Sequence, residues 1–153
     1  MPTARRPVHF LLVEDDPDHA ELVRMSLDVN RVSNTFTHVS DGAEAIAYLH
    51  REGEYADAPR PDVILLDLNL PKVNGHEVLQ HIRSDPALRR LPVVMLTTSD
   101  YDPDRTTAYD LGVNSYMTKP IDYERFQNMV RELDLYWSVW NEPPVDTPPS
   151  QAA

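Results

Sequence analysis

The sequence predicts an α/β fold in which a five-stranded parallel sheet is covered by helices on both faces. Three observations predict it. Short apolar runs alternate with amphipathic segments, no stretch repeats at a fixed period, and 153 residues with 41% apolar content suffice for one domain with one core. Successive parallel strands need right-handed crossovers, so the carboxyl ends of all the strands should lie at one edge of the sheet.

The first strand is expected at residues 8–13, a short apolar run that stops at acidic residues. A helix should follow as far as Val29, because Asp16 is a good N-cap and Pro17 suits the first helical turn. The apolar residues of this segment recur at helical spacing, as an amphipathic helix requires.

The second strand is expected at residues 34–39. Asp41 and Glu44 have the spacing of a capping box, which should open the second helix. The third strand, residues 62–67, is apolar on both faces, and this suits a central strand between two helical layers. A third helix should follow the turn at residues 70–75.

Residues 92–97 form another dense apolar strand, and Asp102 before a proline indicates a further cap and helix. Residues 115–118 are expected to form a brief fifth strand, and Asp122 should cap the last helix. These elements predict a flavodoxin-like (βα)5 three-layer sandwich. The strand order 2-1-3-4-5 is taken over from that class of folds.

The predicted organisation is a flexible N-terminus at residues 1–7, one domain at 8–141 and a flexible, proline-rich tail at 142–153. A second folded domain, such as a DNA-binding output domain, has no room. A net charge of −11 should repel nucleic acid and anionic lipid. No apolar stretch is long enough for a membrane span or a secretory signal, and cysteine is absent, so a soluble cytoplasmic protein is expected.

Acidic residues are predicted to meet at the carboxyl edge of the sheet. Glu14 and Asp15 follow the first strand and Asp67 follows the third. Crowded carboxylates repel one another unless a cation compensates, and Mg2+ prefers such hard oxygen ligands. Taken alone, Glu14 and Asp15 would be helix caps about as often as metal ligands.

A carboxylate can also attack phosphorus. We expect Asp67 to accept the phosphoryl group, because it ends the most buried strand. Phosphoryl transfer depends mainly on charge neutralisation around the phosphoryl oxygens. Thr97 ends the fourth strand and Lys119 follows the fifth, so both should reach the same crevice. Alone, a threonine there would simply be a strand residue.

This set of residues resembles the signature of the CheY-like response regulator receiver family. The set consists of Glu14 with Asp15, Asp67, Thr97, and Lys119 with Pro120. The resemblance covers nearly the whole folded chain. It implies that Asp67 accepts a phosphoryl group from a histidine kinase and that Lys119 and Thr97 hold the phosphoryl oxygens.

The resemblance also implies a Mg2+ site in which Asp15 and Asp67 bind directly, the Asn69 backbone carbonyl contributes, and Glu14 acts through water. Glu14 departs from the more usual aspartate, and Thr98 from the alanine often found beside the threonine.

Two further family features are carried over. The Lys119–Pro120 peptide is expected to be cis. Tyr116 resembles the aromatic residue that changes position as Thr97 turns toward the phosphate, although an isolated tyrosine is more often a core or edge residue.

The last helix carries more apolar surface than one face usually buries, notably Tyr136, Trp137 and Trp140. A homodimer or partner surface is the preferred explanation, and folding back over the domain is the alternative. This ending resembles the stand-alone response regulators of bacterial phytochrome kinases. That likeness implies a light-regulated kinase as partner and output through protein contact.

Two other functions compete with this switch, which is expected to promote its own phosphotransfer and dephosphorylation without being a turnover enzyme. A phosphohydrolase of the haloacid-dehalogenase type wants a second aspartate where Asn69 stands. A scaffold that is never phosphorylated would not need the complete crevice set. Zinc is not expected, because His76 and His81 lie at i, i+5, not at the i, i+4 spacing of a zincin helix.

Overall fold

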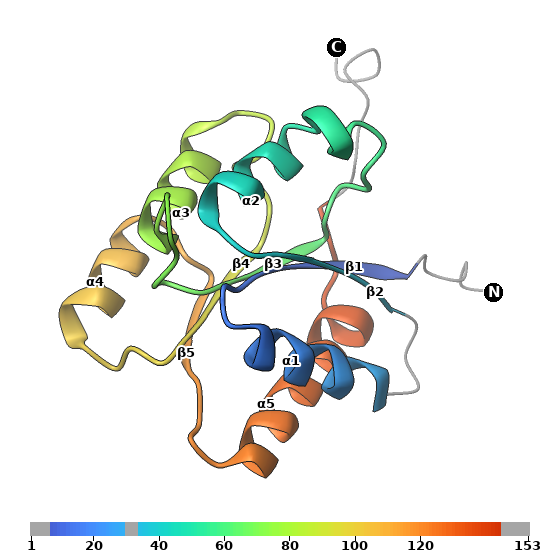
Figure 1. Ribbon diagram of the computed structural model, residues 1–153, viewed down its shortest axis with the longest axis vertical. Coiled ribbons are helices and arrows are strands. Elements are labelled where there is room, and N and C mark those ends of the chain that lie inside the picture. Colours follow the sequence, from blue (N-terminus) through green and yellow to red (C-terminus); the bar gives the residue numbers. More distant parts are fainter. Residues whose placement is uncertain (1–6, 30–33, 145–153) are drawn as a thin grey trace.

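The computed structural model describes residues 7–29 and 34–144. Most of the predicted tails, namely residues 1–6 of 1–7 and residues 145–153 of 142–153, lie outside this range. Figure 1 shows one twisted sheet between two layers of helices. The five strands pair in parallel in the order β2-β1-β3-β4-β5, which confirms the predicted fold. The strands are β1 (Val8–Val13), β2 (Asn34–Val39), β3 (Val63–Leu66), β4 (Val93–Thr97) and β5 (Ser115–Thr118).

Within residues 7–29 and 34–144, five α-helices connect and cover the strands, and two short helical turns accompany them. They are α1 (Pro17–Val29), α2 (Gly42–Leu49), η1 (Gly53–Tyr55), α3 (Gly75–Ser84), α4 (Asp102–Asp110), α5 (Tyr123–Leu135) and η2 (Tyr136–Trp140). Helices α1 and α5 pack together on one face of the sheet, whereas α2, α3 and α4 cover the other (Figure 1).

The central strands bury both of their faces, as their unbroken apolar sequence predicts. In β1, Phe10 and Leu12 face the α1 and α5 side, whereas Leu11 and Val13 face the α2 and α3 side. All four residues of β3 are completely buried. Because both faces are covered, the carboxyl ends of these strands are the natural place for polar chemistry.

Helix caps fix where most helices begin, since an N-cap side chain satisfies free N–H groups of the first turn. Asp16, Asp41 and Asp122 accept such bonds as predicted. The capping box predicted at Asp41 is only half formed, because the Glu44 side chain accepts the N–H of Ser40 and not that of Asp41. Asn74 and Glu77 form a reciprocal capping box at α3. The prediction for Asp102 was wrong: Tyr101 is the N-cap of α4 and makes no side-chain capping bond. Proline is tolerated throughout the first turn, so it does not fix the first residue.

The Lys119–Pro120 peptide is trans, so the cis bond carried over from the family is corrected. An X-Pro bond prefers trans by about 0.5–1 kcal/mol unless its surroundings impose cis. Here the trans bond leaves the Lys119 N–H bonded to the Thr97 carbonyl at 2.7 Å. The ammonium also reaches the acidic residues with the trans bond in place.

Candidate functional site

The loops after β1, β3, β4 and β5 bring the predicted residues to one edge of the sheet. Glu14, Asp67, Thr97 and Lys119 are each at most 7% exposed, whereas Asp15 is exposed. The sequence placed these residues at strand ends, and the parallel pairing of the strands brings the ends together.

Asp67 is held by the start of the loop that follows it. Its Oδ1 accepts the N–H of Leu68 at 2.7 Å and that of Asn69 at 3.4 Å, and its Oδ2 accepts a bond from the Lys119 ammonium at 3.1 Å. Gly75 passes close by, since a Cβ on it would lie 2.3 Å from the Asp67 carbonyl oxygen. The carboxylate is therefore both buried and oriented.

The Lys119 ammonium joins the two buried acids. It donates to Glu14 Oε1 as well as to Asp67. The side chains of Lys119, Glu14 and Asp67 are all almost fully buried. Buried charges are tolerated only when paired, and this ion pair supplies that compensation. Glu14 Oε2 in addition accepts the N–H of Asp16 at 3.2 Å.

The acids offer oxygens suited to a divalent cation. One carboxylate oxygen from each of Glu14, Asp15 and Asp67 lies within 4.8 Å of the others. This hard oxygen set fits Mg2+, which takes one or two carboxylates with water and phosphate. Asn69, whose carbonyl was predicted as a ligand, lies exposed in the loop after Asp67.

Burial raises the pKa of Glu14 from its ordinary 4.5 to about 7, with Lys119 opposing the rise and the Asp67 charge adding to it. A carboxyl group whose pKa is higher in the folded than in the unfolded chain binds its proton more tightly when folded. Its contribution to stability is therefore fully present below pH 4.5 and is lost as the pH rises through about 7.

We expect the metal-free protein to lose stability relative to Glu14→Gln between about pH 5 and about pH 8. The glutamine resembles the protonated acid and does not titrate. Urea unfolding of both proteins in EDTA at the two pH values measures the difference. An equal difference at both pH values would show that Glu14 does not titrate in this window.

Thr97 and Tyr116 are linked through one residue of the loop after β4. The Ser99 N–H donates to Thr97 Oγ1 at 3.3 Å, and the Tyr116 hydroxyl donates to the Ser99 carbonyl at 2.8 Å. The Ser99 hydroxyl donates to Asp104 of α4 at 2.6 Å. A turn of the Thr97 side chain would therefore disturb a loop that contacts both Tyr116 and α4.

His19 belongs to the pocket, although it was not among the predicted site residues. Its Nδ1 lies 3.0 Å from the Lys119 ammonium, which donates to it, and 3.7 Å from Glu14 Oε1. A polar residue in the first turn of α1, four residues after Asp15, was the available signal. The ring lies at the rim of the pocket, with its side chain 35% exposed.

The aromatic residues near the chain's end divide into two groups. Tyr136 and Trp140 are 51% and 74% exposed, whereas Trp137 packs partly buried against the core on the α1 and α5 side. Trp137 therefore follows the alternative of folding back over the domain. For Tyr136 and Trp140 an interface stays a prediction. The α-helix itself ends at Leu135, and residues Tyr136–Trp140 form a π-helical turn.

A parallel α/β sandwich that gathers carboxylates, a hydroxyl and an ammonium at its strand ends has the architecture of a CheY-like receiver. Comparison with known proteins agrees: the chain belongs to the response regulator receiver domain family, whose pattern matches residues 10–131. Among the described residues, no helix combines the length and apolar character needed to cross a bilayer.

The chain is homologous to phytochrome response regulators. Response regulator Rcp1 of Synechocystis sp. is 42% identical over 131 residues, covering 86% of this chain and 89% of Rcp1. A crystal structure of the phosphorylated cyanobacterial phytochrome response regulator RcpA is 44% identical with a TM-score of 0.88, covering 92% and 100% of the two chains. The Mn2+-bound form of Rcp1 is 40% identical with a TM-score of 0.87, covering 91% and 100%.

Proposed function

We propose that this response regulator accepts a phosphoryl group on Asp67 from the phosphohistidine of a sensor kinase, in a Mg2+-dependent reaction. The observation that carries the proposal is the buried cluster of Asp67, Glu14 and Lys119 beside Asp15 and Thr97. The crystal structure of the similar protein RcpA is of its phosphorylated form, and this supports the proposal.

Different residues of the chain have different roles in the transfer. An Asp67 carboxylate oxygen bonds to phosphorus as the phosphorus–nitrogen bond breaks, and the histidine nitrogen keeps the electron pair. Lys119 and the Thr97 hydroxyl bind phosphoryl oxygens. Asp15, Asp67 and the Asn69 carbonyl would hold Mg2+, with Glu14 acting through water. When bound, the ion would neutralise charge on the phosphoryl oxygens.

The switch then operates through the loop after β4. Thr97 gives up the Ser99 N–H when its hydroxyl turns to the phosphoryl group, and the bond between Ser99 and Tyr116 is disturbed in turn. Phosphorylation thereby shifts the population between two arrangements of the Tyr116 and α4 surface. The output is contact with another protein, and the domain is a switch, not a turnover enzyme.

The test is labelling with a small phosphodonor such as acetyl phosphate. We expect incorporation of one phosphoryl group per chain with Mg2+ and none with EDTA. The label should be released by hydroxylamine, which cleaves acyl phosphates. Labelling that is unaffected by EDTA, or repeated turnover on phosphate monoesters, would contradict the proposal.

We propose a phytochrome-type histidine kinase as the donor, on the strength of the similarity to RcpA and Rcp1. Kinases labelled on their phosphohistidine should transfer to this chain faster when they carry a phytochrome sensor than when they carry an unrelated one. Equal rates from both kinases would argue against this partnership.

We further propose that Tyr136 and Trp140, with the adjoining part of Trp137, form a homodimer surface. Exposed aromatic side chains are enriched at interfaces, and two of them lie on one turn here. Light scattering should give a dimer for the wild type and a monomer for Trp140→Ala. Tyr109→Ala, an exposed aromatic on α4, is the control and should stay dimeric. A monomeric wild type would contradict the proposal.

A further inference from the structure

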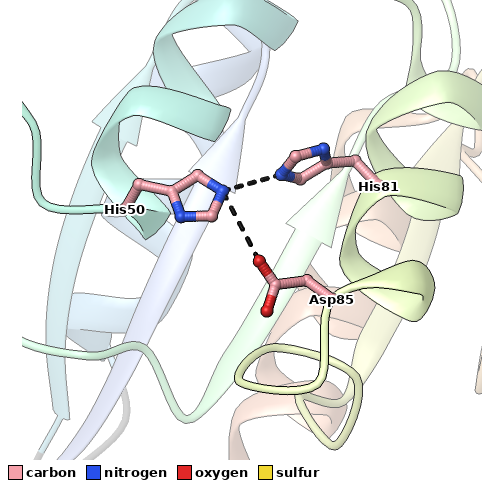
Figure 2. Close-up of side chains that lie close together, drawn as sticks. All are labelled: His50, His81 and Asp85. Atoms are coloured by element: carbon pink, nitrogen blue, oxygen red, sulfur yellow. Dashed lines mark hydrogen bonds and ion pairs between the residues drawn. The ribbon is translucent and has the colours of Figure 1, made fainter.

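A second group of metal-ligating side chains lies between α2 and α3, outside the phosphoryl site. It consists of His50, the C-cap of α2, His81 in the last turn of α3, and Asp85, the C-cap of α3. Figure 2 shows the three side chains converging from the two helices. His81 is six residues beyond Gly75, which corresponds to about 9 Å along the helix away from the Asp67 loop.

The ligand atoms approach one another closely. His50 Nε2 lies 2.7 Å from His81 Nε2 and 3.8 Å from Asp85 Oδ2. One ligand atom from each of the three residues lies within 4.8 Å of the others. Two ligands at about 2.1 Å from a tetrahedral zinc ion are separated by roughly 3.4 Å. The observed separations fall on either side of that value, so small side-chain rotations would suffice.

The backbone holds these ligands in place. The other Asp85 oxygen, Oδ1, accepts the Ala87 N–H at 2.8 Å, which leaves Oδ2 directed toward His50. The position of His50 is set by the end of α2, where its N–H bonds to carbonyls of the last turn. Preorganised ligands lose less conformational entropy when an ion binds.

We propose that His50, His81 and Asp85 bind a divalent transition-metal ion of the Zn2+ type. Two imidazoles and one carboxylate with an open position are a set that zinc accepts, whereas Mg2+ prefers oxygen. The side chains of His50 and Asp85 are 33% and 25% exposed, so water has access to the fourth position. The bound ion joins the end of α2 to the end of α3.

Within α3, His76 and His81 lie five residues apart, which is not the spacing of a zincin helix. The structure pairs His81 with His50, which comes from another helix 31 residues away. Spacing rules detect ligands that share an element, so a site assembled between helices gives no such signal.

The test is Zn2+ titration of the full chain by calorimetry in excess Mg2+, which occupies the acidic pocket. We expect one tight Zn2+ per chain, and at least about a tenfold weaker affinity in His81→Gln and in Asp85→Asn. His76→Gln, on the same helix but outside the cluster, is the matched control and should bind like the wild type. Co2+ should give tetrahedral visible absorption in the wild type and not in His50→Gln.

A thermal measurement separates ligand loss from misfolding. Zn2+ should raise the unfolding temperature of the wild type and of His76→Gln, but not that of His81→Gln. Without zinc, all variants should keep Mg2+-dependent labelling by acetyl phosphate. Absence of saturable Zn2+ binding to the wild type, or unchanged binding in both His50→Gln and His81→Gln, would overturn the proposal and leave a hydrogen-bonded histidine pair.

Discussion

Replacing Asp67 by asparagine is expected to lower the rate of Mg2+-dependent labelling by at least about 10³-fold. Asparagine has nearly the same shape, but its amide oxygen is neutral and is a poor nucleophile toward phosphorus. The measurement is incorporation from labelled acetyl phosphate under saturating Mg2+, followed by mapping of the modified peptide.

The control for this substitution is Asp110→Asn, which makes the same change of charge at an exposed position on α4. It should label like the wild type. The Asp67→Asn protein should also remain folded without metal, because the Lys119 ammonium keeps Glu14 as its partner. Wild-type labelling of a folded Asp67→Asn protein would show that another residue is the acceptor.

Replacing Lys119 by alanine is expected to destabilise the metal-free protein by about 3–5 kcal/mol. The substitution leaves the buried carboxylates of Glu14 and Asp67 without the ammonium that links them. The loss should be largest near pH 8 and smaller near pH 5, because the pKa of Glu14 is raised to about 7. Urea unfolding in EDTA at the two pH values measures it.

Two comparisons give this prediction its specificity. Lys72, which lies 3.4 Å from Asp41 with its side chain 69% exposed, is a surface counterpart, and Lys72→Ala should cost less than about 1 kcal/mol. In the Lys119→Ala background, Glu14→Gln should recover stability near pH 8, because it removes one of the two buried negative charges that have lost the ammonium. If Lys119→Ala were as stable as Lys72→Ala, the ammonium would not be compensating the acids.

The sequence by itself determined the fold and most of the phosphoryl pocket. Apolar runs gave the strands, and caps such as Asp16 and Asp122 gave helix starts, because both signals are read within a few residues. Once the strands are parallel, residues that follow them must share one edge. The meeting of Asp67 with Lys119 was therefore predictable although 52 residues separate them.

Only the tertiary structure decided how side chains at that edge and elsewhere face one another. It placed His19 against Lys119, buried Glu14 while leaving Asp15 exposed, and gave the Lys119–Pro120 bond its trans form. It also brought His50 of α2 against His81 of α3. The rotation of a helix about its axis and its offset from its neighbour are set by packing of the whole core, so contacts between helices are not encoded in any short stretch of sequence.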